Sequence, residues 1–214
     1  MGWTETTFAN TKRGVRPTTA ELADTYLGAS LWGTERFEVL ASAHKTRGRT
    51  EDGFNEYTLW LYGKPTWGSY TGDEAIVLTV LLSIDWEGGT ICYKDFGLDS
   101  GNIPPASFLK ALPESLGDEW ADKQLAAIRD RIEREKALKK ALVPGALVSF
   151  GEKVDFTNDM KARWLEVTTY YSRTGRKMKG LRIDGTPVRV NMGRDWVSRV
   201  REYIPVGAVD PVAV

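Results

Sequence analysis

Alternating apolar and polar residues mark two strands in the first third of the chain, at residues 37–44 and 57–62. A repeat of two residues is the pattern of a strand with one buried face. Residues 48–53 separate the two strands and have the composition of a turn, so we expect a hairpin with a long loop. Its predicted faces comprise Phe37, Val39, Ala41 and Ala43 on the first strand, and Tyr57, Leu59 and Leu61 opposed to Trp60 and Tyr62 on the second.

Two more strands complete a predicted N-terminal sheet. Residues 75–82 are apolar throughout, and their β-branched content favours a buried strand over a helix. Gly88 and Gly89 then turn the chain into a short strand at residues 90–94. The sequence therefore predicts an antiparallel meander of four strands.

A helix is predicted before this sheet. Thr18 and Glu21 have the spacing of a capping box, in which each residue bonds to the backbone of the other. We expect the helix to run to about Leu27, where Gly28 stops it, and to cover the sheet.

The middle of the chain has the apolar spacing of helices. A short helix is opened by Pro105 and closed by Pro113. A longer, charged helix follows from about Asp118 to Ala141, with acidic residues at its start and basic residues at its end, as the helix dipole prefers. Its apolar stripe comprises Ala121, Leu125, Ile128 and Ile132.

Short strands follow the Val143-Pro144-Gly145 boundary, at residues 146–150, 163–171, 178–183 and 187–191. So short a β chain protects its edges by closing on itself, which predicts a small SH3-like β-barrel. The expected fold is therefore α+β. Its parts are an antiparallel sheet domain with a covering helix at 1–112, a connecting helix at 113–142, the barrel at 143–207 and a tail at 208–214.

Composition limits the cellular compartment and the classes of partner expected for the chain. The 214 residues have equal numbers of acidic and basic side chains, so no global field directs the chain to nucleic acid or to an anionic membrane. The single cysteine, Cys92, favours a reducing cytoplasm. The N-terminus has no basic segment followed by an apolar one, and the apolar run 75–82 is far shorter than the roughly 20 residues that span a bilayer. We expect a cytoplasmic protein without a membrane partner.

Charge is nevertheless unevenly distributed. Residues after Ala141 include 12 basic and 8 acidic side chains, an excess of four positive charges. Basic residues interleaved with aromatic ones favour nucleic acid, because cations neutralise phosphates while rings stack on bases. The alternative is a solvated hairpin whose rings point into the barrel. The candidate nucleic-acid-binding residues are Arg173, Arg176, Lys177, Lys179, Arg182 and Tyr171, near Trp164 and Tyr170.

Catalytic motifs are few. The sequence has neither a phosphate-binding P-loop nor a dinucleotide fingerprint, and His44 is its only histidine, without ligands at metal-binding spacing. Carboxylates on two adjoining strands could converge with a lysine as a magnesium site of the kind nucleases use. These catalytic candidates are Asp85, Glu87, Lys94 and Asp95, although a Lys94–Asp95 pair at a strand end more commonly makes ordinary ion pairs. We expect binding rather than catalysis, and no cofactor.

Spaced blocks along the chain resemble a family of proteins carried by bacteriophages and mobile genetic elements. They comprise Met1-Gly2-Trp3-Thr4, Tyr93-Lys94-Asp95, the helix at 105–112, the helix containing Trp120, and Pro144-Gly145. Similar proteins commonly continue after the Lys-Asp pair with further acidic residues, whereas this chain continues with Phe96-Gly97-Leu98-Asp99. The resemblance implies a phage or mobile-element origin and a bacterial host cytoplasm, without a defined activity. We expect Trp3 to pack near the Lys94-Asp95 strand end.

Three functions are compatible with these observations. The first is a phage or mobile-element accessory protein whose basic hairpin binds nucleic acid. The second is an inhibitor of a host protein such as a defence enzyme, for which eight tryptophans supply interface anchors. The third is a metal-dependent hydrolase or nuclease.

Overall fold

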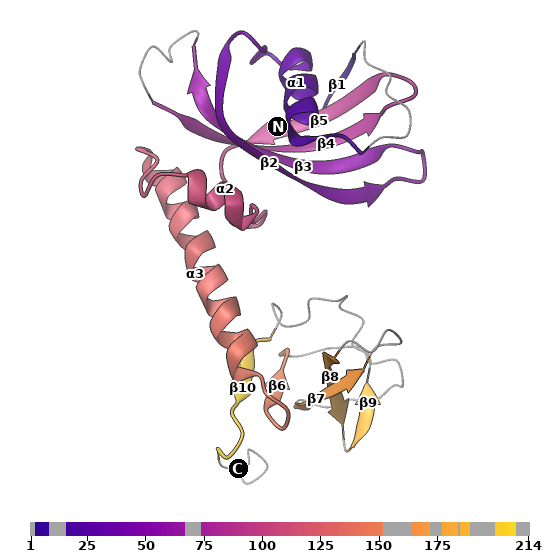
Figure 1. Ribbon diagram of the computed structural model, residues 1–214, viewed down its shortest axis with the longest axis vertical. Coiled ribbons are helices and arrows are strands. Elements are labelled where there is room, and N and C mark those ends of the chain that lie inside the picture. The colour runs from indigo at the N-terminus through magenta and orange to yellow at the C-terminus, as the bar shows by residue number, and fades with distance from the viewer. Residues whose placement is uncertain are drawn as a thin grey trace. The chain divides into compact units, whose positions relative to one another are not determined.

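The computed structural model describes residues 3–8, 16–66, 74–151, 164–171, 177–183, 185–188 and 200–208. The chain is a mixed α+β protein with two antiparallel sheets, as the sequence predicts (Figure 1). It divides into two compact units, Met1–Arg129 and Asp130–Val214. Among the described helices, none has both the length and the apolar character needed to cross a membrane.

The sheet of the first unit contains the predicted meander and one further strand. Its strands are β1 (Thr4–Thr7), β2 (Phe37–Arg49), β3 (Asn55–Pro65), β4 (Ile76–Asp85) and β5 (Thr90–Phe96), in the order β1-β5-β4-β3-β2. All neighbouring strands are antiparallel. The strand β1 has no apolar alternation of its own, since its sequence is Thr-Glu-Thr-Thr, and it is defined by pairing with β5.

Helix α1 (Thr19–Ala29) begins at the predicted capping box. The backbone N–H of Thr18 donates to Oε2 of Glu21 at 2.9 Å, and the backbone N–H of Glu21 donates to Oγ1 of Thr18 at 3.2 Å. The predicted end at Leu27 is wrong, because the helix continues through Gly28 to Ala29. A glycine inside a helix costs only about 1 kcal/mol relative to alanine, and burial of the helix's apolar face outweighs that cost.

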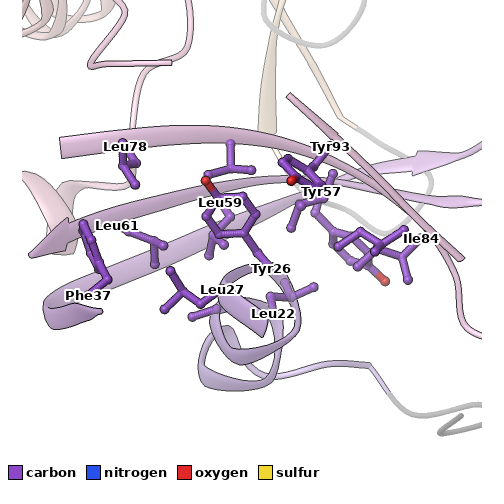
Figure 2. Packing of buried hydrophobic residues seen from close by; sticks show 14 residues of the cluster. Leu22, Tyr26, Leu27, Phe37, Tyr57, Leu59, Leu61, Leu78, Ile84 and Tyr93 are labelled. Atoms are coloured by element: carbon purple, nitrogen blue, oxygen red, sulfur yellow. The ribbon is translucent and has the colours of Figure 1, made fainter. Parts of the chain in front are cut away.

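The core of the first unit lies between α1 and one face of the sheet. Figure 2 shows Leu22, Tyr26 and Leu27 of α1 directed at side chains of the strands. The strand residues in this core include Tyr57, Leu59, Leu61, Val80, Leu82, Ile84 and Ile91, each at most 4 % exposed. The predicted grouping of Tyr57, Leu59 and Leu61 on one face of β3 is therefore confirmed.

A bulge in β2 corrects the predicted face of that strand. The register shifts between Val39 and Ala41, so Ala41 pairs with Tyr62 and Ala43 with Trp60. These partners belong to the face opposite α1, whereas Phe37 belongs to the α1 core. One extra residue moves every later side chain to the other face of a strand, which the alternation alone does not reveal.

The face of the first sheet opposite α1 is covered by α2 (Ala106–Ala111) (Figure 1). This short helix begins after Pro105, as predicted, and ends at Ala111, one residue before the predicted last residue Leu112. The long helix α3 (Glu119–Ala141) follows, also as predicted, and the boundary between the two units falls within it. The buried side chains on this side of the unit include Trp60, Phe108, Leu125 and Ile128.

The second unit contains a separate antiparallel sheet and core. Its strands are β6 (Leu147–Ser149), β7 (Leu165–Tyr171), β8 (Lys177–Ile183), β9 (Thr186–Val188) and β10 (Glu202–Ile204), in the order β10-β6-β7-β8-β9. Its core includes Leu138, Leu142, Val148, Leu165, Val167 and Leu181. No ladder between β9 and β10 closes the sheet within the described ranges, so the SH3-like barrel stays a prediction. The predicted strand at 187–191 extends past Val188 into residues outside the described ranges.

Candidate functional site

The basic hairpin is only partly within the described structure. Strands β7 and β8 pair with Tyr171 opposite Lys177. Arg173 and Arg176 belong to residues 172–176, which lie outside the described ranges, as do the side chains of Tyr171 and Lys177. The described cations of the hairpin are Lys179 and Arg182.

Lys179 donates a hydrogen bond to the long helix α3. Its Nζ donates to the backbone carbonyl of Lys139, in the last turn of α3, at 2.5 Å. A cation at this position stabilises the negative end of the helix dipole. Burial lowers the pKa of Lys179 from its ordinary value. Lys179 therefore has a structural role.

Arg182 is engaged by a carboxylate. Its Nε and Nη2 donate to Oε2 and Oε1 of Glu166 at 2.7 and 2.5 Å, which is a bidentate pair. The hydrogen bond from Arg182 lowers the pKa of Glu166. Because residues three apart on a strand point to opposite faces, Lys179 and Arg182 do not share one surface. The described part of the hairpin thus lacks the single cationic face that the sequence suggested.

The four catalytic candidates do not converge. Asp85 pairs with Thr90 and Asp95 pairs with Val80, so the two carboxylates are five residues apart along β4, about 16 Å at the usual strand rise, and on opposite faces. Asp85 instead caps a turn, accepting the backbone N–H of Glu87 at 3.0 Å. Lys94 and Asp95 are consecutive on β5 and also face opposite ways. Within the described part of the chain, no three His, Cys, Asp or Glu residues form a metal site.

His44 has a structural partner. Its Nδ1 lies 2.8 Å from Oγ1 of Thr19, which joins β2 to the first turn of α1. Burial lowers the pKa of His44. This hydrogen bond links α1 to the sheet.

Asp95 is the best-defined polar centre of the first unit. Its Oδ2 accepts hydrogen bonds from the hydroxyl of Tyr26 and from Nε1 of Trp32, the latter at 3.1 Å. Asp95 shares its face of β5 with buried Ile91 and Tyr93. The carboxylate therefore lies on the α1 side of the sheet, beside the end of that helix.

Two tyrosines complete the surroundings of Asp95. Tyr26 and Tyr93 make an edge-to-face contact with ring centres 5.3 Å apart, and Figure 2 shows the two side chains between α1 and β5. The hydroxyl of Tyr93 donates to the carbonyl of Ala29, the last residue of α1, at 3.5 Å. Burial, followed by the hydrogen bond and charge of Asp95, raises the pKa of Tyr26. Burial, followed by the charge of Asp95, also raises the pKa of Tyr93.

Three tryptophans gather around this end of β5. Trp3 precedes Thr4, which pairs with Tyr93, so Trp3 lies at the Lys94 end of the β1–β5 ladder. Trp120 of α3 lies directly on Gly97, because a Cβ added to that glycine would be 2.9 Å from its Cζ3. Trp32 is bonded to Asp95. We name Trp3, Trp32, Lys94, Asp95 and Trp120 the β5-end cluster. Trp32 and Asp95 lie on the α1 face of the sheet, whereas Lys94 faces the other side.

The β5-end cluster is partly open to solvent. Trp3 is 57 % exposed and Trp120 is 51 % exposed. The expected position of Trp3 near Lys94 follows from the register, but its indole is largely exposed.

The sequence gives one signal that identifies part of this cluster. Asp95 continues the every-other-residue series of Ile91 and Tyr93, which places a carboxylate on a buried face. Its donors, Tyr26 and Trp32, are more than 60 residues away and carry no such signal.

Neither protein-family models nor curated proteins nor solved structures provide a match to this chain.

Proposed function

We propose that the protein acts by binding a partner protein through the β5-end cluster. The observation that carries the proposal is the presence of two half-exposed indoles, Trp3 and Trp120, at the same end of one strand. Tryptophan is enriched among the residues that dominate interface energetics, because it combines a large apolar area with one directed donor. A side chain that is already held rigidly binds more tightly, because less conformational entropy is lost when the partner binds. Trp120 is supported by α3 and by the backbone at Gly97.

The partner that we propose is a protein of a bacterial host, such as a defence enzyme, and we propose a phage or mobile-element origin for the chain. The support for this origin is the resemblance carried by Met1-Gly2-Trp3-Thr4 and Tyr93-Lys94-Asp95. Both blocks contribute residues to the β5-end cluster. A protein that binds a host enzyme in this way would work in the host cytoplasm.

Capture of a host protein from lysate at high salt tests the proposal. The wild-type chain is expected to retain a host protein, and Trp3→Ala and Trp120→Ala are each expected to weaken that binding by at least about tenfold, as for an interface anchor. The matched control is Tyr203→Ala, which removes a similarly exposed aromatic side chain from the second unit and should leave binding unchanged. Equal binding by all variants, or no host protein retained by the wild type, would contradict the proposal. Thermal unfolding of each variant verifies that it is folded.

A second candidate function is nucleic-acid binding by the hairpin of β7 and β8, within a barrel of SH3-like form. It is supported by the excess of four positive charges after Ala141. Because Lys179 and Arg182 are engaged internally, we assign the contact to Arg173, Arg176 and Lys177. Replacing these three by glutamate should abolish a binding that falls steeply with salt. Affinity unaffected by salt or by the triple substitution would remove this candidate.

A further inference from the structure

We propose that Asp95 receives a basic side chain, lysine or arginine, from the partner protein. This inference rests on the proposed function and adds the chemistry of the contact. Four features of the structure support it: the state of the carboxylate, the end of α1, the surrounding rings and the position of Lys94.

The first feature is a carboxylate with neutral neighbours. Among the described residues, Asp95 accepts two hydrogen bonds, both at one oxygen, Oδ2, and both from uncharged donors, Tyr26 and Trp32. An ionised carboxylate offers about four acceptor positions, so capacity remains at Oδ1. Within the described residues Asp95 makes no ion pair. Neutral donors fix the position of the group without cancelling its charge.

The second feature is the end of α1. The carbonyl of Ala29 accepts the hydroxyl of Tyr93, and Tyr93 touches the ring of Tyr26, which bonds to Asp95. The carboxyl end of a helix carries a partial negative charge, and the last turn of α1 contains no basic residue. The helix end and Asp95 therefore add negative potential at the same place, which favours a cation.

The third feature is aromatic. Tyr26 and Trp32 direct their O–H and N–H groups at the carboxylate, and the rings of Tyr26 and Tyr93 are buried beside it. These rings lower the local dielectric, which strengthens the attraction between the carboxylate and a cation. A metal ion is a poor alternative, because hard cations need several oxygen ligands and Asp95 belongs to no group of three His, Cys, Asp or Glu side chains among the described residues. An ammonium or guanidinium group needs only one carboxylate.

The fourth feature is the direction of Lys94. It is adjacent to Asp95 in sequence but faces the other side of β5, so it is not the partner of this carboxylate. The half-buried Trp32 and the neighbouring Leu31, which is 84 % exposed, place the site at the surface of the first unit. A side chain from a bound protein can reach it there.

The test uses the full chain and small model compounds at constant ionic strength. N-acetyl-lysine methylamide and N-acetyl-arginine methylamide are titrated while the indole N–H resonance of Trp32 is followed by NMR. The uncharged analogue N-acetyl-citrulline methylamide is the matched ligand control. We expect a saturable shift with both cations and none with citrulline. An equal shift with citrulline, or none with either cation, would overturn the inference.

Two isosteric variants test whether cation binding depends on the charge of Asp95 itself or on the net charge of the protein. Asp95→Asn keeps an acceptor for Tyr26 and Trp32 while removing the charge, and should weaken cation binding at least about tenfold. Asp99→Asn removes one charge from the following loop, where Asp99 bonds to Asn102 and Gly101, and should leave binding unchanged. Equal effects of both variants would contradict a specific role for Asp95.

Partner capture distinguishes this inference from the proposed function. If Trp120→Ala loses the host protein and Asp95→Asn retains it fully, the function stands and the basic contact is wrong. If no host protein is retained but the lysine compound still binds at Asp95, the proposed function fails and with it the assignment of the cation to a partner protein. Loss of capture in both variants, with capture intact in Asp99→Asn, supports both.

Discussion

The hydrogen bond between Tyr26 and Asp95 stabilises the fold, and it depends on the protonation state of the tyrosine. The hydroxyl of Tyr26 is fully buried and donates to a charged carboxylate, a class of hydrogen bond that contributes about 1.5–3 kcal/mol. The phenol must remain protonated to donate. Because the pKa of Tyr26 is higher in the folded protein, the phenol loses its proton at a lower pH in the unfolded chain than in the folded one.

A pH dependence follows from this proton. The pKa values of Tyr26 and Tyr93 are raised in the folded protein, so the contribution of both phenols is fully present below pH 10 and is lost as pH rises above that value. Each phenol reduces the free energy of unfolding by up to about 1.4 kcal/mol per pH unit in this range. Urea denaturation from about pH 8 to about pH 11 should show the decline, and Tyr26→Phe should make it shallower. An unchanged slope in Tyr26→Phe would contradict the assignment.

For single residues, the sequence predicted a local hydrogen-bonding motif but not the partners that lie far away along the chain. Alternation in β5 identifies Asp95 as facing a core, and the capping box of Thr18 and Glu21 is local and was predicted correctly. The bonds from Tyr26 and Trp32 to Asp95 join residues far apart in sequence, and only the folded sheet brings them together. The same holds for the engagement of Lys179 by the carbonyl of Lys139.

Among the elements, strand β3 and helix α1 each contain a glycine, and the two glycines differ in the space around them. Gly63 of β3 faces the bulged start of β2, and a Cβ there would lie 2.3 Å from the carbonyl of Glu38 and 2.5 Å from the ring of Phe37. Gly28 is exposed in the last turn of α1, and a Cβ there would meet nothing within 4 Å.

Alanine at these two positions should change stability in opposite directions. Gly63→Ala forces backbone and ring apart and is expected to destabilise the first unit by about 1–3 kcal/mol, as overpacking does. Gly28→Ala is expected to stabilise α1 by about 0.5–1 kcal/mol, because alanine restricts the unfolded chain and suits a helix. The two variants carry the same chemical change, so each is the control for the other in urea denaturation. Effects of the same sign would refute this account of the two sites.

Elements with strong apolar periodicity were predicted correctly, and those defined by pairing were not. Strand β3 and helix α3 have clear patterns and lie where the sequence places them. Strand β1 is polar and exists through its ladder with β5, and the bulge of β2 appears only in its register with β3. Register is a relation between strands, so one strand's sequence does not contain it.

The two units of the molecule have separate hydrophobic cores, so each unit is expected to have its own free energy of unfolding. The core of the first unit draws on α1 and strands β2 to β5, whereas that of the second begins at Leu138. Neither cluster shares a residue with the other. Charge is also divided unequally, because the residues after Ala141 carry an excess of four positive charges although the net charge of the whole chain is zero.

Core truncations should therefore act locally. Leu59→Ala in the first unit and Leu165→Ala in the second, both almost fully buried, are each expected to cost about 2–5 kcal/mol. Amide hydrogen exchange should accelerate within the unit that carries the substitution and remain unchanged in the other core. Acceleration in both cores by one substitution would show that the units unfold together.

The contact between Trp120 and Gly97 has an evolutionary consequence. Any side chain at position 97 would occupy the space of the indole, so these two positions are not free to vary independently. A relative with a larger residue in place of Gly97 should carry a smaller residue in place of Trp120, and the two changes should be inherited together. Such paired replacement would reveal, from sequences alone, which relatives keep an exposed indole at this end of β5 and which have lost it.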